Sequence, residues 1–238
     1  MSEIKLFEVG GSIRDSKLGI ESKDRDFCAV SMGGWDQLVA WSKSNMNKVF
    51  LITPQFFTIR GIIGRDPVDI VMCRKDGEST DGRRPDLVEP GSIFDDLKRR
   101  DFTVNSMARE VFLDSLSPKG DLIDPFGGAS DLKNNILRTV GNTEDRFSED
   151  GLRILRALRF IATKGFCPDT KIKDAMSDSK WWKFMEDTVS IERTREELQK
   201  MFKHDTPLAL SVISEFVPSN STKILFSKIW LKPTLEKK

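Results

Sequence analysis

The sequence predicts an α+β fold in which a mixed α/β head precedes an all-helical portion. In the first half of the 238-residue chain, short runs rich in β-branched and aromatic residues alternate with helical patterns. After Thr143, nearly every segment has the apolar spacing of a helix. Strands that come first and helices that come afterwards are typical of the α+β class. A chain of this length can also bury a substantial core.

The first half is expected to contribute strands, two helices and a long loop. Residues 75–91 are rich in Gly, Pro and charge, which predicts a mobile loop. The other predicted elements are strands at 4–9, 27–30, 49–52, 56–63 and 68–73, and helices at 12–18 and 34–44.

From Ser92 onward the pattern is helical, with interruptions at 121–128 and 136–141. No internal repeat or Pro-rich linker divides this part of the chain. The predicted helices lie at 149–164, 169–178, 190–203 and 206–216.

The composition argues against several kinds of site. His204 is the only histidine and tyrosine is absent, which argues against a His-centred triad or a Tyr acid. The three cysteines are far apart and form no C-x-x-C pair, so we expect neither a zinc ribbon nor a disulfide framework. The same pattern favours a reduced, cytoplasmic setting. The net charge of +1 means that a nucleic acid would be held by local basic patches. We expect neither a signal peptide nor a membrane span.

Two aspartates, Asp24 and Asp26, stand one residue apart in ESKDRDFCAV, where an apolar run begins. On a strand both side chains would point to the same face, with Cα atoms about 6.6 Å apart. Such like charges repel unless a cation binds them, so the pair is a candidate site for divalent metal. An N-cap or Asx turn is the alternative interpretation. Asp69 also lies on an apolar run and is a candidate third carboxylate, or else an edge-strand aspartate.

A glycine pair, Gly10 and Gly11, lies between the first predicted strand and the first predicted helix. Glycines at such a junction let backbone N–H groups approach a phosphate, and the helix dipole favours its charge. Arg14, one turn later, can add a charge-assisted contact. The alternative interpretation is that the two glycines serve only to form a tight turn. A phosphate site so close to the Asp pair suits a nucleoside triphosphate bound with Mg²⁺. Two such ions about 3.5–4 Å apart would activate an attacking hydroxyl and stabilise the leaving pyrophosphate.

A third cluster lies in KRRDFTVNSMA. Arg100 can bind phosphate or ribose oxygens. Asp101 and Asn105 are four residues apart and would share one face of a helix. Asp101 can equally serve as a helix N-cap.

The segment EDGLRILRALRF begins at Glu149 and predicts an amphipathic helix with one apolar and one charged face. A solvated, salt-bridged face is the simplest interpretation. A sharper hypothesis is that Asp150 accepts a hydrogen bond from the amino group of cytosine or adenine while Arg153 donates to the adjacent ring nitrogen. Uracil and guanine present the reverse order, and a buried Asp facing a carbonyl would cost about 1–3 kcal/mol. Glu149, four residues before Arg153, is expected to hold that arginine.

Five blocks of the sequence together resemble the class II tRNA nucleotidyltransferase family, which includes CCA-adding enzymes and bacterial poly(A) polymerases. They are EVGGSIRD, KDRDF, KRRDFTVNSMA, DPFGGASDLKNNILRTVG and RFSEDGLRILRALRF, and they cover residues 8 to about 160 in the order of the family. The resemblance implies a polymerase-β-like nucleotidyltransferase head at 1–123, a helical neck with the nucleobase-recognition helix at 124–200, and a shortened helical body at 201–238. Residues 124–128 match the hinge of the family.

The resemblance also implies Mg²⁺-dependent addition of CCA, from CTP and ATP, to the 3′ end of tRNA by two-metal phosphoryl transfer. Asp24 and Asp26 would be the metal ligands, with Asp69 as a further catalytic carboxylate. The residues expected to bind nucleotide are Gly10, Gly11, Arg14, Arg100, Asp101, Asn105, Asp150, Arg153, Arg156 and Arg159.

Two departures from the family keep alternatives open. Gly82 precedes Arg83-Arg84-Pro85 where the family commonly has His, and Lys238 ends the sequence earlier than in members with full body and tail regions. The alternatives are an enzyme that adds only CC or only A, a poly(A) polymerase, and, in another class, a non-catalytic RNA-binding protein that retains the fold.

Overall fold

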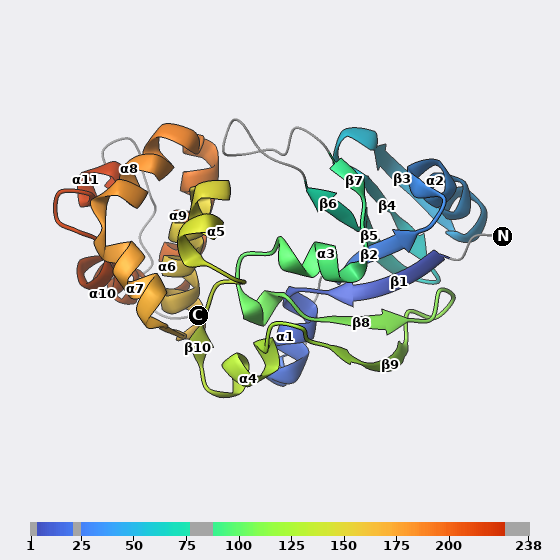
Figure 1. Cartoon of the computed structure of the whole chain (residues 1–238), viewed down its shortest axis with the longest axis horizontal. Helices are drawn as coiled ribbons and strands as arrows, with labels where there is room; N and C mark the ends of the chain where they lie inside the picture. The colour runs from blue at the N-terminus through green and yellow to red at the C-terminus, as the bar shows by residue number, and fades with distance from the viewer. Residues whose placement is uncertain (1–3, 21–24, 77–87, 227–238) are drawn as a thin grey trace. The chain divides into compact units, whose positions relative to one another are not determined.

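The computed structural model describes residues 4–20, 25–76 and 88–226 (Figure 1). The chain divides into two compact units, residues 1–78 with 86–130, and residues 79–85 with 131–238. Throughout the described ranges, every helix is too short or too polar to cross a bilayer.

The first unit is built on a seven-stranded sheet with the order β3-β4-β5-β2-β1-β8-β9. β2 and β5 pair in parallel, and the other neighbours pair antiparallel. A separate antiparallel pair joins β6 to β7. The strands are β1 (Ile4–Val9), β2 (Asp26–Ser31), β3 (Lys48–Thr53), β4 (Thr58–Ile63), β5 (Asp66–Met72), β6 (Arg74–Asp76), β7 (Val88–Pro90), β8 (Ala108–Val111) and β9 (Pro118–Ile123).

Period-two alternation along these strands creates two apolar clusters in the first unit. One cluster includes Phe27 and Ile70 together with Leu38 of helix α2. The other includes Cys28 and packs against Leu97 of α3. The helical elements are α1 (Gly11–Lys17), α2 (Gly34–Asn45), η1 (Pro54–Phe56), α3 (Ile93–Lys98), η2 (Thr103–Asn105) and α4 (Gly128–Lys133), the last of which crosses the division between the units.

The second unit is mainly helical. Its long amphipathic helix α6 buries Leu155 and Leu158 against α9 and α10, as the 3.6-residue spacing predicts. α6 ends at Gly165, whose φ of 70° provides the left-handed C-cap that glycine favours. The elements are β10 (Ile136–Leu137), paired with β11 (Cys167–Pro168), and α5 (Thr143–Glu149), α6 (Leu152–Lys164), α7 (Thr170–Ser177), α8 (Ser179–Thr188), α9 (Ile191–His204), α10 (Thr206–Phe216) and α11 (Thr222–Phe226).

The α+β class is confirmed, but four details of the sequence prediction are wrong. Strands β8 and β9 lie where helix was expected, because β8 pairs with β1 and β9 pairs with β8, and this pairing decides the conformation of such short segments. The ends of the expected loop at 75–91 pair as β6 and β7. Helix α8 was not predicted, and the helix expected at 149–164 is two helices, with Asp150 in an extended conformation between them.

The expected division into head, neck and body stays a prediction. The two units separate at residues 130 and 131 rather than at 123 and 124, and the expected boundary at 200 falls within α9. In the expected hinge, Asp124 accepts hydrogen bonds from the backbone N–H groups of Gly128 (2.7 Å) and Ala129 (2.9 Å). These bonds fix the local turn.

Candidate functional site

Two carboxylates lie next to each other on the parallel strands β2 and β5. Asp26 is the register partner of Asp69. The residues that follow them, Phe27 and Ile70, are buried together in the cluster on the opposite face, so the two aspartates share the other face of the sheet. Asp26 is exposed, and Asp69 is 37% exposed. The sheet therefore brings Asp26 and Asp69 together, whereas Asp24 lies outside the described residues.

Asp69 is paired with Arg60, its antiparallel partner on β4. The Arg60 guanidinium donates two hydrogen bonds of 2.6 Å, one to each carboxylate oxygen of Asp69. Arg60 is 57% exposed, so solvent screens the pair and its contribution to stability is small. Arg60, Asp69 and Asp26 thus occupy one row across three neighbouring strands.

The donor chemistry of this row suits Mg²⁺, which prefers carboxylate oxygens and is usually bound through one or two carboxylates plus substrate phosphates. Among the described residues no group of three His, Cys, Asp or Glu side chains could enclose a metal ion. The carboxylates that could contribute are therefore Asp26 and Asp69, together with Asp24 from outside the described ranges.

The glycine turn after β1 lies beside Arg100. Gly10 has a φ of 74°, a conformation that L side chains rarely adopt. A Cβ atom at Gly10 would also lie only 2.8 Å from Nη1 of Arg100. The turn is tied to the chain near Arg100 because the Gly10 N–H donates to the Met107 carbonyl at 3.3 Å. The fold thus joins the two sequence motifs that were expected to bind nucleotide phosphates.

A second contact between these motifs runs through Asn105. Nη1 of Arg14 donates to Oδ1 of Asn105 at 2.5 Å, and Nδ2 of Asn105 donates to Oδ1 of Asp101 at 3.1 Å. All three residues are buried. The expectation that Asp101 and Asn105 share a helix face is wrong in its geometry, because residues 103–105 form a short 3₁₀ turn that brings the two side chains into contact. Asp101 accepts a hydrogen bond from the backbone of Phe102 (2.8 Å) and does not cap an α-helix.

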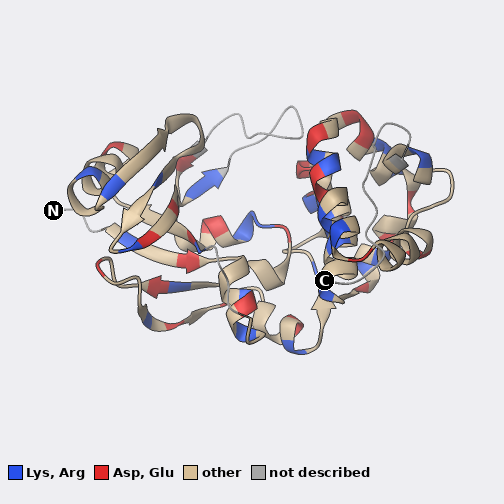
Figure 2. Cartoon of the chain, turned by 180° about the vertical axis from the view of Figure 1, so that it is seen from behind, with Lys and Arg blue, Asp and Glu red and all other residues tan. Residues whose placement is uncertain are grey.

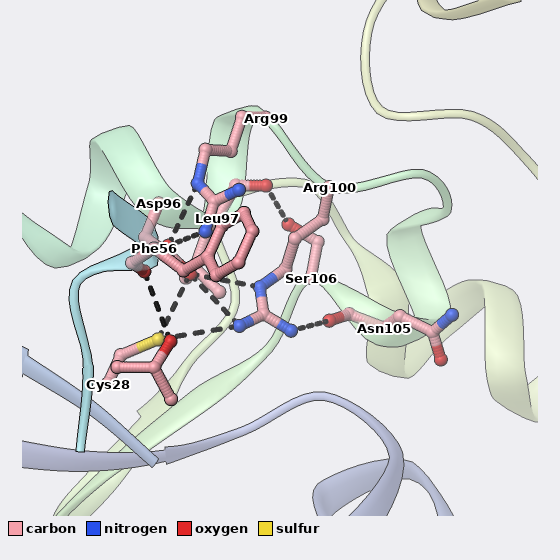
Figure 3. A network of polar contacts seen from close by, with 9 residues as sticks. Cys28, Phe56, Asp96, Leu97, Arg99, Arg100, Asn105 and Ser106 are labelled. Carbon is pink, nitrogen blue, oxygen red and sulfur yellow. Dashed lines mark hydrogen bonds and ion pairs between the residues drawn. The ribbon is translucent and has the colours of Figure 1, made fainter. Parts of the chain in front are cut away.

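Sequence reasoning missed a buried carboxylate next to this cluster, Asp96 of α3. It accepts hydrogen bonds from Arg99, Arg100 and the thiol of Cys28 (Figure 3). Burial alone would raise the pKa of Asp96, but the two guanidinium groups outweigh it and hold this pKa below its usual range. The i,i+4 spacing of Asp96 and Arg100 is the sequence signal that could have identified the pair.

In the second unit, Asp150 lies at the junction between α5 and α6. Oδ1 of Asp150 accepts a hydrogen bond from the backbone N–H of Leu152 at 3.1 Å, as an N-terminal cap of α6 would. Arg193 of α9 donates to both carboxylate oxygens, at 3.2 and 2.7 Å. Arg193 was also missed, because nothing in the sequence connects it with a residue 43 positions earlier.

The expected support of Arg153 by Glu149 is confirmed. Nη1 of Arg153 donates to Glu149 at 2.7 Å and to the backbone carbonyl of Arg146 at 3.0 Å. Arg146 also forms an ion pair with Glu149. Burial lowers the pKa of Arg146, but Glu149 opposes this effect. The carboxylate of Glu149 thus lies between two arginines at the end of α5.

Arg156 and Arg159 contact a third residue that was not predicted, Glu197 of α9. Glu197 accepts a hydrogen bond from Arg159 at 2.5 Å, lies 3.6 Å from Arg156, and pairs with Lys200 at 3.1 Å. Burial would raise the pKa of Glu197, but Arg159 and Arg156 hold it below its usual value. Figure 2 shows basic and acidic positions interspersed along the helices of this unit. Arg156 and Arg159 of α6 are therefore held by α9 through Glu197.

Known proteins resemble this chain in both sequence and structure. Residues 6–138 match the family described as the poly A polymerase head domain. A CCA-adding enzyme of Bacillus velezensis is 32% identical over 84% of this chain and 46% of its own length. A CCA-adding enzyme of Lactobacillus helveticus is 32% identical over 98% of this chain and 57% of its own length. The chain thus spans about half the length of the curated relatives it matches.

Solved structures of CCA-adding enzymes also resemble this chain. The Bacillus stearothermophilus CCA-adding enzyme in complex with CTP superimposes with a TM-score of 0.72 and 27% identity, over 91% of this chain and 50% of that one. The Thermotoga maritima CCA-adding enzyme complexed with tRNA superimposes with a TM-score of 0.70 and 27% identity, over 97% of this chain and 50% of that one. Since the head-domain match covers more than half of the sequence, the resemblance is confirmed, and the chain belongs to the family of class II tRNA nucleotidyltransferases and poly(A) polymerases.

Proposed function

We propose that this chain is a template-independent RNA nucleotidyltransferase that adds CCA, from CTP and ATP, to the 3′ end of tRNA. Family membership supports nucleotidyl transfer, and the CTP and tRNA bound by similar proteins support these substrates. The observation that carries the proposal is the row of Asp26 and Asp69, in the same unit as the glycine turn beside Arg100. The cytoplasmic setting expected from the cysteines belongs to the same proposal.

In this reaction the RNA 3′-hydroxyl oxygen attacks the α-phosphorus, and the bond from that phosphorus to pyrophosphate breaks in line. Asp24 and Asp26 would hold Mg²⁺, with Asp69 as the third carboxylate. Two bound Mg²⁺ ions supply charge neutralisation at the attacking and leaving oxygens. The backbone N–H groups of Gly10 and Gly11 would bind the triphosphate.

Basic and polar side chains of the first unit would complete the triphosphate and ribose contacts. Arg14 and Arg100 carry the positive charge, and both contact Asn105, through its side chain and its backbone carbonyl respectively. Asp101 orients Asn105 through the 3.1 Å hydrogen bond. This arrangement preorganises donors for the phosphates and the sugar.

Base selection is assigned to Asp150 and Arg153 in the second unit, with Arg156 and Arg159 supporting the nucleotide or RNA. The Asp150 carboxylate would accept from the amino group of C or A, and Arg153 would donate to the adjacent ring nitrogen. A carboxylate oxygen can accept two hydrogen bonds, so Oδ2 of Asp150 can accept from a base while it remains bonded to Arg193. U and G would present a carbonyl to this carboxylate and be rejected.

The decisive experiment supplies tRNA transcripts that end at the discriminator base, at C, or at CC, each with one NTP or with all four. We expect C to be added to the first two transcripts, A to the third, and CCA when CTP and ATP are both present. Sequencing of the product ends separates the outcomes. Addition that stops after CC or that starts only from CC would identify a partial enzyme, and long A tails on unrelated RNA would identify a poly(A) polymerase. RNA binding without incorporation would support the non-catalytic alternative.

A further inference from the structure

The buried carboxylate of Asp96 has no role in the reaction proposed above. It lies on α3, its side chain is completely buried, and its two oxygens face donors from three residues. Oδ1 accepts from Nε (3.0 Å) and Nη2 (2.6 Å) of Arg99. Oδ2 accepts from Nε (3.1 Å) and Nη2 (2.9 Å) of Arg100 and from Sγ of Cys28 (3.2 Å). Figure 3 shows these side chains converging on the carboxylate.

Both arginines of this cluster are partly accessible, whereas the carboxylate is not. Two guanidinium groups, those of Arg99 and Arg100, contact the single carboxylate of Asp96. Arg99 and Arg100 are 28% and 21% exposed, so solvent or a ligand can reach them, whereas Asp96 is inaccessible. Positive charge held in such a partly desolvated setting attracts an anion more strongly than an exposed arginine would.

Asp96 also fixes the direction of the Arg100 side chain. The edge of the guanidinium formed by Nε and Nη2 is occupied by Asp96, and Nη2 lies 3.5 Å from Sγ of Cys28. The remaining nitrogen, Nη1, is directed to the carbonyl of Asn105 (3.4 Å) and to the Gly10 turn. An arginine without such support samples many rotamers, and fixing them costs free energy when a ligand binds.

We propose that Asp96 is a positioning residue, which holds Arg100 beside the glycine turn so that the guanidinium of Arg100 binds the phosphates of the incoming nucleotide. Cys28 takes part from β2, two residues after Asp26, and links this support to the strand that carries Asp26. This role rests on the proposed function and adds to it a residue that touches neither metal nor nucleotide.

The test compares Asp96→Asn with Asp95→Asn. Both variants replace a neighbouring carboxylate of α3 with its amide, but Asp95 is only half-buried, and its carboxylate accepts solvent-exposed hydrogen bonds from the N-cap residue Ser92 (2.6 and 2.8 Å). We expect Asp96→Asn to raise the KM for CTP and for ATP by about tenfold to a hundredfold, because hydrogen bonds to a charged group are lost. The preference for C and A over U and G should not change. Asp95→Asn should keep the KM within about twofold, since surface substitutions have small effects.

Pyrophosphate provides a readout that does not depend on catalysis. Its Kd, measured by calorimetry, should rise for Asp96→Asn in proportion to the KM and stay constant for Asp95→Asn. Equal affinities of the two variants for pyrophosphate would overturn the proposal. If the wild-type chain binds pyrophosphate but incorporates no nucleotide, the proposed function fails while this comparison still decides the role of Asp96.

Cys28 variants decide the question if Asp96→Asn does not fold. Cys28→Ala removes the thiol donor without a change in charge, whereas Cys28→Ser keeps a donor. We expect Cys28→Ala to weaken pyrophosphate binding by about twofold to tenfold, as the loss of a single modest hydrogen bond would, and Cys28→Ser to retain it. Unchanged affinity in Cys28→Ala, with circular dichroism confirming the fold, would contradict the proposed network.

Discussion

The guanidinium of Arg193 donates to both carboxylate oxygens of Asp150, at 3.2 and 2.7 Å. Both side chains are partly buried, with 30% and 25% of their surfaces exposed. Asp150 is in an extended conformation between two helices, so its direction depends on this contact and on its hydrogen bond to the backbone of Leu152. A residue of α9 thus orients the carboxylate to which base selection is assigned.

Removal of this contact should impair base selection. We expect Arg193→Ala to lower kcat/KM for CTP and ATP by about tenfold to a hundredfold, because a charged hydrogen-bond pair is lost and the carboxylate can turn away. Arg195→Ala is the control, since Arg195 is exposed on the same helix. Single-nucleotide incorporation with each of the four NTPs measures the effect. Equal kinetics of the two variants would show that Arg193 does not support selection.

Replacement of Arg153 should relax the choice of base more than it weakens binding of the triphosphate. We expect Arg153→Ala to bring incorporation of UTP and GTP within about tenfold of CTP and ATP, because the donor to the ring nitrogen is gone. Glu149→Gln should produce a weaker form of the same change, since Glu149 holds Arg153 at 2.7 Å. An unchanged profile across the four NTPs in Arg153→Ala would argue against the assigned role.

The carboxylate row predicts a metal requirement. Asp26→Ala should lower kcat by at least about a hundredfold, because metal ligands contribute several kcal/mol of charge stabilisation, and EDTA should abolish incorporation by the wild-type chain. Asp69→Asn should also lower kcat, whereas Asp66→Asn, at the exposed start of the same strand, should not. Binding of Mn²⁺ followed by electron paramagnetic resonance checks the site without turnover. Full activity of Asp69→Asn would show that Asp69 forms an ion pair with Arg60 but does not contribute to the metal site.

The glycine turn predicts a difference in nucleotide binding between alanine variants of two glycines that both have positive φ. Gly10 and Gly19 have φ values of 74° and 71°, so alanine is strained at either position and should cost about 1–3 kcal/mol of stability. A Cβ at Gly10 would lie 2.8 Å from Arg100, whereas none of the described atoms outside its immediate neighbours lies within 4 Å of a Cβ at Gly19. Gly10→Ala alone should therefore raise the KM for both nucleotides. Thermal melts monitor stability, and equal KM values would contradict a role for the turn in positioning Arg100.

Glu197 should make stability depend on pH. Its pKa is depressed in the folded state, so its contribution is complete above the unfolded pKa of about 4.3 and is lost as the pH falls through the folded value. We expect Glu197→Gln to lose about 1–3 kcal/mol of unfolding free energy near neutral pH, because Arg159 and Arg156 lose their partner. The difference from wild type should shrink below about pH 4. Urea denaturation at several pH values measures it, and a constant difference would contradict the assigned pairing.

Local patterns predicted much of the fold. The first strand was predicted with its observed bounds, because its alternating apolar residues end at a glycine pair. The contact between Glu149 and Arg153 followed from their i,i+4 spacing. The helix break at Asp150 was missed although Gly151 marks it, because the apolar pattern runs through the break. A Cβ at Gly151 would lie 2.9 Å from Thr188 Oγ1, so close packing against the end of α8 explains the glycine.

Contacts between distant segments could not be predicted from one sequence. Strand β8 is only four residues long and includes the charged residues Arg109 and Glu110, so its strand character depends on pairing with β1. The support of Asp150 by Arg193 likewise exists only after α9 packs against α6. Sequence reasoning therefore proposed the candidate site residues and the local support by Glu149, but missed Arg193 and Glu197, which come from distant segments.

The parallel pairing of β2 with β5 has a consequence for how the protein folds. Parallel neighbours cannot be joined by a tight hairpin, and here α2, β3 and β4 all lie between the two strands in the sequence. Closing such a long connection costs chain entropy before any contact repays it, which makes pairings of this kind slow. A chain leaving the ribosome therefore has Asp26 long before it has Asp69 as a neighbour, and we expect affinity for divalent cations to arise late, as a marker of the completed sheet.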